Sequence, residues 1–170
     1  MPKRSAGILM YRRRPPRGAI ELLLVHPGGP FWAKRDWGAW SIPKGEYIDG
    51  EDALAVAKRE FEEETGRRPQ GEFLALGDLV QPGRKIVAAW GLEGDFDPAT
   101  LKSNEFQLEW PPKSGRKASF PEVDRAGWFS PADARRKILP GQSEFIARLL
   151  KALGEKAVAE KPLGEKAAGG

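Results

Sequence analysis

Short apolar runs separated by proline and glycine dominate the hydropathy pattern of the chain. The run Leu22 to Val25 is too short for a helix of its own, and Pro82 with Gly83 marks a turn between two further runs. Apolar runs of this length between turn residues are typical of β-strands. The pattern predicts strands over residues 5–11, 19–26, 72–81, 85–93, 105–110 and 126–129, with the first two paired as a hairpin, and loops over 12–18, 31–41 and 111–121.

Two segments show helical periodicity instead. In residues 49–65, Leu54, Ala57 and Phe61 recur on one face, Asp49 is placed to cap the first turn, and Gly66 follows the last. Residues 142–153 repeat the pattern with an apolar face of Phe145, Ile146, Leu149 and Leu150, and a short helix is expected to begin at Pro131 with Ser130 as its cap.

These elements amount to one α/β domain. The chain has 170 residues, which is an ordinary length for a single domain with its own core. We assign residues 1–153 to this domain. Residues 154–170 contain little apolar mass and repeat part of the sequence LGEKA, so we expect a flexible, low-complexity tail there.

Composition excludes several classes of site. The chain has no cysteine and one histidine, so disulfides, thiol nucleophiles, cysteine-bound zinc and two-histidine metal sites are ruled out or strained. No apolar run approaches the length of a membrane span, and the N-terminal apolar stretch stops at Arg12, too early for a secretory signal. We therefore expect a cytoplasmic protein without a membrane partner.

Charge is distributed unevenly along the chain. The net charge is +4, yet residues 46–64 hold eight acidic and only two basic side chains, which leaves the remainder strongly basic. Carboxylates gather where a hard cation must be bound, and basic surroundings suit an anionic substrate. A basic nucleic-acid-binding module is an alternative, but no nucleic-acid motif accompanies the positive charge.

Three carboxylates share one face of the helix expected over residues 49–65. At about 100° per residue, Glu64 lies roughly 40° from Glu60 on one side and Glu63 lies roughly 60° from it on the other. These like charges repel one another, and Arg59 is expected to pair with only one of them at a time. A bound Mg²⁺ or Mn²⁺ ion would remove the repulsion, because such ions prefer carboxylate and phosphate oxygens.

The segment 45–67 resembles the Nudix box, GX5EX7REUXEEXGU, in which U is a bulky aliphatic residue. Phe61 and Arg67 depart from it, because the first is aromatic and the second replaces the last aliphatic position. The resemblance implies an α/β/α sandwich with a mixed β-sheet, in which a loop-helix-loop carries the box. The matching positions are Gly45, Glu51, Arg59, Glu60, Glu63, Glu64 and Gly66.

The same resemblance implies a metal site and its supporting residues. Glu60, Glu63 and Glu64 would hold Mg²⁺ or Mn²⁺, with the carbonyl oxygen of Gly45 as a further ligand. Arg59 would orient Glu60. Glu51 and Gly66 would support the loops at the two ends of the helix.

Nudix enzymes cleave a nucleoside diphosphate linked to another group, by attack of water on phosphorus. The glutamate that takes the proton differs between members, and Glu60 is our first choice here, with Arg59 and Glu63 in the same catalytic set. A later loop often supplies one more acid. We expect Glu122 in that role rather than Glu109.

Candidate substrate contacts come from basic and aromatic residues. Lys44, directly before the box, and Arg116 with Lys117 in the basic loop are expected to contact phosphate oxygens. Among the tryptophans of residues 31–41, we expect Trp40 to stack on a nucleobase. Weaker candidates are Trp32, Trp37, Arg84, Lys85 and Lys113, and His26 is expected to be a strand-end residue without a catalytic role.

Markers of the substrate class conflict. Pro82 occupies the place where ADP-ribose pyrophosphatases of the family often carry proline, but the serine and glutamate that accompany it are missing. Dinucleoside polyphosphate hydrolases often carry a tyrosine in this region, and none follows Tyr47. We expect a nucleoside triphosphate or dinucleoside polyphosphate hydrolase. The alternatives are an ADP-ribose-type pyrophosphatase or a non-catalytic nucleotide-binding protein, and the oligomeric state, including a homodimer, stays open.

Overall fold

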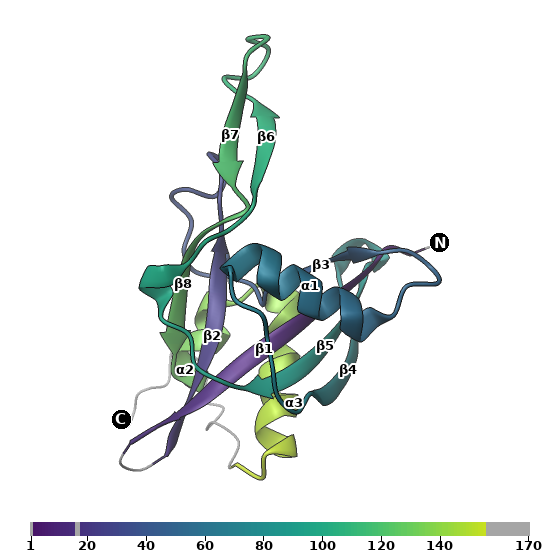
Figure 1. Ribbon diagram of the computed structural model, residues 1–170, viewed down its shortest axis with the longest axis vertical. Helices are drawn as coiled ribbons and strands as arrows, with labels where there is room; N and C mark the ends of the chain where they lie inside the picture. Colours follow the sequence, from purple (N-terminus) through teal and green to yellow (C-terminus); the bar gives the residue numbers. More distant parts are fainter. Residues whose placement is uncertain (1, 16–17, 156–170) are drawn as a thin grey trace.

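A mixed six-stranded sheet forms the centre of the computed structural model, which describes residues 2–15 and 18–155 (Figure 1). The strands along its main path follow the order β4-β5-β1-β2-β8, and β3 pairs with β1 outside that path. β1 runs parallel to β5 and antiparallel to β2 and β3. The strands are β1 (Arg4–Arg14), β2 (Ala19–Pro27), β3 (Lys44–Tyr47), β4 (Leu74–Val80), β5 (Ile86–Glu93) and β8 (Val123–Phe129).

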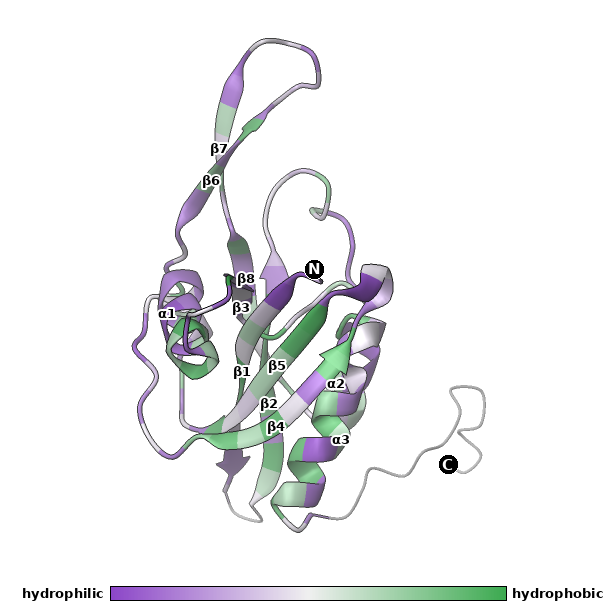
Figure 2. Cartoon of the chain, turned by 90° about the vertical axis from the view of Figure 1, so that its right-hand side faces the viewer, coloured by the Kyte–Doolittle hydropathy of each residue, from purple (hydrophilic) through white to green (hydrophobic). Residues whose placement is uncertain are grey.

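Helices cover both faces of this sheet (Figure 2). α1 (Ala53–Thr65) packs on one face, and α2 (Pro131–Lys137) with α3 (Ser143–Ala152) packs on the other. Successive residues of β1 point to opposite faces, so Ile8 enters the core under α1 while Leu9 enters the core under α3. The α/β/α sandwich is therefore confirmed. Three short 3₁₀ helices span Pro82–Arg84, Pro98–Thr100 and Pro140–Gln142.

The box helix begins later than its sequence pattern indicates. Asp52, not Asp49, is the N-cap, and its carboxylate accepts a hydrogen bond from the backbone N–H of Ala55. Gly66 ends α1 in the left-handed conformation at φ 87°, and its N–H donates to the carbonyl of Glu62. The residues between Tyr47 and Asp52 thus form a loop that leads from β3 into α1.

A projecting β-hairpin replaces the loop expected over residues 111–121. β6 (Glu105–Glu109) pairs antiparallel with β7 (Lys117–Pro121), and Phe106 lies opposite Phe120. β7 alternates apolar and polar positions over only five residues and directly follows a basic, proline- and glycine-containing stretch. The hydropathy pattern therefore predicts a loop there instead of a strand. β3 was missed as well, because its four residues carry no apolar pattern.

The remaining predicted elements are confirmed with shifts of a few residues at their ends. Ser130 caps α2 by accepting a hydrogen bond from the N–H of Asp133. The apolar face of α3 is buried as its periodicity predicts. No helix in the described residues is long and apolar enough to span a membrane. Of the tail expected over 154–170, residues 156–170 lie outside the described residues.

Candidate active site

Close packing between β3 and α1 sets the position of Glu60. Gly45 in β3 pairs with Ala6 near the start of β1. A Cβ atom added to Gly45 would lie 2.1 Å from the carboxyl carbon of Glu60. A side chain larger than hydrogen would force the Glu60 carboxyl to move, because real Cβ atoms essentially never show so short a contact. Glu60 can therefore keep its observed position only because residue 45 is glycine.

Arg59 lies among three carboxylates. Its guanidinium nitrogens are 3.6 Å from Glu51, 3.7 Å from Glu60 and 3.8 Å from Glu63. The expectation that it pairs with one acid at a time is wrong, because its planar group presents several N–H donors in different directions. The other oxygen of Glu51 accepts a hydrogen bond from the N–H of Ile48 at 2.9 Å, which closes the loop before α1.

Glu64 is the most strongly perturbed acid of the site. Burial, followed by the negative charge of Glu60, raises its pKa to about 8, against the opposing effect of Lys44. The pKa of Glu60 is also raised, first by burial and then by the charge of Glu63. Burial and the charge of Glu63 raise the pKa of Glu122 as well.

The negative charge of neighbouring acids contributes to each of these raised pKa values, after burial. Glu122 belongs to the same group although it is 58 or more positions away from the helix glutamates in the sequence, since its charge acts on both Glu60 and Glu64. Lys44 balances part of this charge, and burial lowers its own pKa. Such clusters of perturbed groups mark functional sites more often than structural ones.

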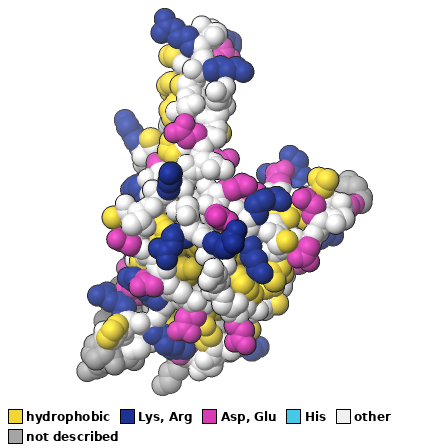
Figure 3. All heavy atoms as spheres, viewed as in Figure 1, with side chains coloured by type: hydrophobic (Ala, Val, Ile, Leu, Met, Phe, Trp, Pro, Cys, Tyr) yellow, Lys and Arg dark blue, Asp and Glu magenta, His cyan; other side chains and the backbone are white. Residues whose placement is uncertain are grey.

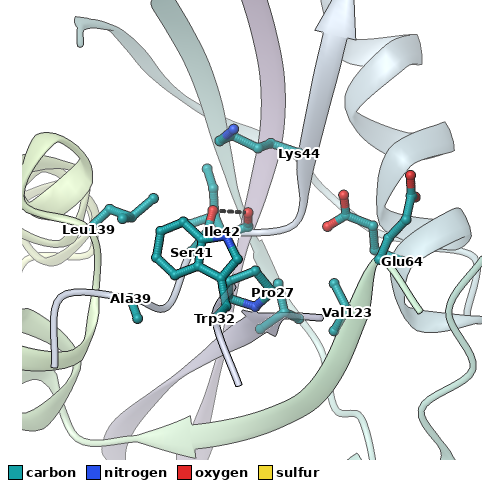
Figure 4. Close-up of a pocket in the computed structure, with 11 residues that line it drawn as sticks. Pro27, Trp32, Ala39, Ser41, Ile42, Lys44, Glu64, Val123 and Leu139 are labelled. Carbon is teal, nitrogen blue, oxygen red and sulfur yellow. Dashed lines mark hydrogen bonds between the residues drawn. The ribbon is translucent and has the colours of Figure 1, made fainter. Parts of the chain in front are cut away.

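A cavity of about 200 Å³ opens beside these acids (Figure 4). Lys44, Glu64 and Glu122 supply its charged wall. Trp32 and Val123 supply part of its apolar wall. A pocket that joins an apolar wall to a few charged groups has the character of a ligand site.

The donor set suits a hard divalent cation. Within residues 2–15 and 18–155, no three acidic or histidine side chains converge closely enough to enclose an ion as they stand. The available donors are nevertheless carboxylate oxygens, which Mg²⁺ and Mn²⁺ prefer, and burial together with neighbouring negative charge raises the pKa of Glu60 and Glu64. The chemistry of these residues therefore fits such a cation.

Trp40 does not reach the cavity as a stacking surface. It is only 5% exposed and packs edge-on against His26 and Phe129 in the core. Trp37 is 65% exposed but lies beside Arg136 and Lys137. Trp32 is the tryptophan of residues 31–41 that lines the cavity, and only the tertiary pairing of these segments distinguishes the three.

Arg116 and Lys117 are also placed elsewhere. They lie at the far end of the projecting β6–β7 hairpin, where Lys and Arg side chains gather in Figure 3. Five residues of extended chain, roughly 16 Å, separate Lys117 from Glu122. Glu109, the alternative to Glu122, is on the same hairpin and accepts a hydrogen bond from the N–H of Gly115. Lys85, by contrast, is close enough to Lys44 to lower its pKa.

Comparison with known proteins identifies the family. The sequence model described as NUDIX domain matches residues 1–149. No curated protein matches the chain.

Solved structures agree in fold. An Ap4A hydrolase from C. elegans, in a binary complex, superposes with a TM-score of 0.60 at 22% identity and covers 88% of this chain and 98% of its own. A MutT protein from Methanosarcina mazei gives 0.58 at 20% identity, over 90% and 96% of the two chains. The NUDIX domain of Shewanella oneidensis NrtR, complexed with ADP ribose, gives 0.58 at 15% identity, over 90% and 89%. The family model, together with the box residues on α1 and in the segments beside it, establishes that this chain belongs to the Nudix family and is one of its pyrophosphohydrolases.

Proposed function

We propose that the chain hydrolyses the pyrophosphate linkage of a nucleoside triphosphate or dinucleoside polyphosphate, with Mg²⁺ or Mn²⁺ as its cofactor. The observation that carries this proposal is that Glu64 and Glu122 line the same cavity as Lys44 and Trp32, with Glu60 close enough for its charge to act on Glu64. A cation site and a nucleotide site are thereby neighbours.

The residues of the site have three roles: binding the cation, orienting Glu60 and accepting a proton. Glu60, Glu63 and Glu64, with the carbonyl of Gly45, would hold the cation. A bound divalent cation supplies neutralisation of the diphosphate and increases the acidity of an attacking water. Glu60 is the proposed general base, since its raised pKa makes it more basic than an exposed carboxylate, and Arg59 holds its orientation. Glu122 is the second acid, and Lys44 is placed to contact phosphate.

Free nucleotides fit this site better than nucleic acid. The three arginines at the end of β1 are already engaged with acids: Arg12 pairs with Glu21 and Asp95, Arg13 with Glu155, and Arg14 with Glu21. Charges that are neutralised within the protein contribute little to binding a phosphate backbone. We propose a cytoplasmic enzyme that acts on small-molecule nucleotides.

A hydrolysis panel tests the function. The chain would be incubated with Mg²⁺ and ATP, diadenosine tetraphosphate, ADP-ribose or NADH, with chromatography of the nucleotide products. The proposal requires the highest kcat/KM for a triphosphate or a dinucleoside polyphosphate. Highest activity on ADP-ribose would support the alternative class instead, because the structure in complex with ADP ribose shares the same fold. Binding without turnover of any compound would indicate a non-catalytic nucleotide-binding protein.

Adding Mg²⁺ or Mn²⁺ to the metal-free protein at pH 7 is expected to release protons. The pKa of Glu64 is raised to about 8, so its carboxyl is mostly protonated at pH 7, whereas a cation binds the carboxylate form. The release would be measured with a pH indicator in weakly buffered solution. Glu64→Gln should release fewer protons. Equal release from both proteins, or full turnover in excess chelator, would contradict the assignment of the metal site.

Trp32→Ala is expected to raise KM for the nucleotide about tenfold with a smaller change in kcat. Loss of stacking between an aromatic side chain and a base costs roughly 1–3 kcal/mol, and an indole ring takes no part in the proposed proton transfer. Trp37→Ala is the matched control, because Trp37 is exposed and does not line the cavity. Similar KM values for the two variants would argue against a base next to Trp32.

A further inference from the structure

His26 is a buried ionisable group that the proposed reaction does not use. It lies near the end of β2, is 0% exposed, and is the sole histidine of the chain. Its neighbours Val25 and Pro27 both line the active-site cavity. The histidine therefore lies directly behind one wall of that cavity, with its ring turned into the protein.

Both ring nitrogens of His26 face oxygen atoms that can only accept hydrogen bonds. Nδ1 lies 2.8 Å from a carboxylate oxygen of Asp124, and Nε2 lies 2.6 Å from the backbone carbonyl oxygen of Arg35. A neutral imidazole has one N–H and one lone pair, so it can satisfy only one of these oxygens. The arrangement is satisfied on both sides only by the imidazolium, in which both nitrogens donate.

An irregularity in the sheet directs Asp124 toward this ring. β2 and β8 pair His26 with Arg125, but the next pair is Pro27 with Val123, so the register skips Asp124. A bulge of this kind reorients a side chain, and bulges are frequent beside active sites. Val123 and Glu122, which follow toward the start of β8, line the cavity.

The second contact of His26 leads to Trp32. The backbone N–H of Arg35 donates to the carbonyl of Trp32 at 2.9 Å, and the carbonyl of Arg35 is the oxygen held by His26. The guanidinium of Arg35 also lies 5.3 Å from the centre of the Trp32 ring. His26 thus connects Asp124 on β8 with the turn that carries the aromatic wall of the cavity.

The other charged groups near His26 do not replace these contacts. Arg125 lies 3.6 Å from the same oxygen of Asp124. Asp36 accepts hydrogen bonds from Trp40 and Lys137 instead of from the histidine. Trp40 presents its ring to His26 at 5.2 Å between centroids. Asp124 is therefore the carboxylate that balances the imidazolium.

We propose that His26 is a positioning residue whose imidazolium form holds the Trp32 turn against β8, so that nucleotide binding weakens when His26 loses its proton. In either neutral tautomer, one nitrogen lone pair faces an oxygen at less than 3 Å, and that contact becomes repulsive. The Arg35 carbonyl or Asp124 must then move away. None of the hydrogen bonds of His26 reaches Glu60, Glu63, Glu64 or Glu122, so the larger effect is expected on KM. This consequence for KM rests on the proposed function.

The protonation of the ring can be measured without any substrate. With one histidine in the chain, the imidazole nitrogens of a ¹⁵N-histidine-labelled protein give signals that need no further assignment. Two N–H nitrogens are expected in the folded protein, with the loss of one N–H on titration. A single N–H at every pH at which the protein is folded would overturn the proposal, whether or not the chain hydrolyses nucleotides.

Kinetics on two variants test the positioning role. His26→Gln is expected to raise KM about tenfold at every pH, the factor that corresponds to loss of one good hydrogen bond, with kcat changed less than about threefold. In Asp124→Asn, the amide can donate to Nδ1 while Nε2–H still donates to Arg35, so a neutral ring satisfies both contacts. The wild-type rise of KM over the pH range of the NMR transition should therefore disappear in Asp124→Asn.

Asp78→Asn is the matched control, because it removes the same charge from an exposed position on β4. It should retain the wild-type pH dependence of KM. Glu60, Glu64 and Lys44 titrate in all of these proteins, so only the difference between wild type and Asp124→Asn reports on His26. An unchanged KM in His26→Gln, or the wild-type pH profile in Asp124→Asn, would overturn the proposal. If no substrate is turned over, calorimetric binding of ADP with Mg²⁺ replaces KM, and the same comparisons apply.

Discussion

Glu64→Gln is expected to reduce turnover roughly a hundredfold to a thousandfold while the fold is retained. The substitution keeps the size of the side chain but removes a negative charge from the proposed cation site, where charge stabilisation of the transition state is usually worth that much. The measurement is kcat for the best substrate of the panel at saturating Mg²⁺. Thermal unfolding of the same protein shows whether the fold persists.

The same variant is expected to change how stability depends on pH. The folded-state pKa of Glu64 is about 8, above the ordinary value of 4.5, mainly because of burial. A raised pKa means that the folded protein binds the proton more tightly than the unfolded chain does, so the associated stability is complete below pH 4.5 and is lost as the pH rises toward 8. The Tm of the metal-free wild type should therefore fall between those pH values, and the fall should be smaller in Glu64→Gln.

Glu62→Gln is the control for both measurements. Glu62 lies on the same helix but is exposed, and its ion pair is with Arg68 at 3.8 Å, away from the other box acids. It should keep wild-type turnover and the wild-type dependence of Tm on pH. Comparable losses of kcat in Glu62→Gln and Glu64→Gln would mean that general helix charge, and not a cation site, supports activity.

Gly45→Ala is expected to lower kcat about a hundredfold or more, the second large effect. The added methyl group would lie 2.1 Å from the carboxyl carbon of Glu60, so the glutamate must leave its position between β3 and Arg59. A displacement of about 1 Å in a catalytic group can cost a hundredfold in rate. Steady-state kinetics would show the loss in kcat, with KM changed less.

Gly50→Ala separates this steric effect from a backbone effect. Gly50 has a φ of +94°, so alanine is strained there, but an added Cβ would meet no atom within 4 Å. It should lose some stability and much less activity than Gly45→Ala. If Gly45→Ala retained kcat, or if both variants lost it equally, the position of Glu60 would not depend on the glycine.

The chemistry of the box could be predicted from the sequence because it is local. In a helix, spacing alone sets the angle between side chains, so Glu60, Glu63 and Glu64 were assigned to one face before any fold was known. Gly66 followed from the need for a left-handed residue at the helix end, and the structure has it at φ 87°. Asp49 was wrong as the cap because several acids in the loop could serve, and only the path of the chain from β3 selects Asp52.

The substrate side of the site was predicted less well because it depends on contacts between distant segments. Three tryptophans lie within nine residues, and their local sequence does not distinguish them. In the structure Trp40 packs in the core, Trp37 faces solvent and Trp32 lines the cavity. Arg116 and Lys117 precede Glu122 closely in sequence, but a hairpin carries them away from it. No periodic pattern in the sequence indicates either placement.

Thus the sequence alone predicted the acidic helix, because that depends on spacing within one element, and the resemblance of its box implied the family and the sandwich fold. Tertiary structure decided which residues meet the helix. It brought Glu122, the residue before β8, to the box acids, packed Gly45 against Glu60, and turned Asp124 toward His26 through a one-residue shift in strand register. These contacts join segments up to about a hundred residues apart, and their geometry follows from sheet pairing that no local pattern encodes.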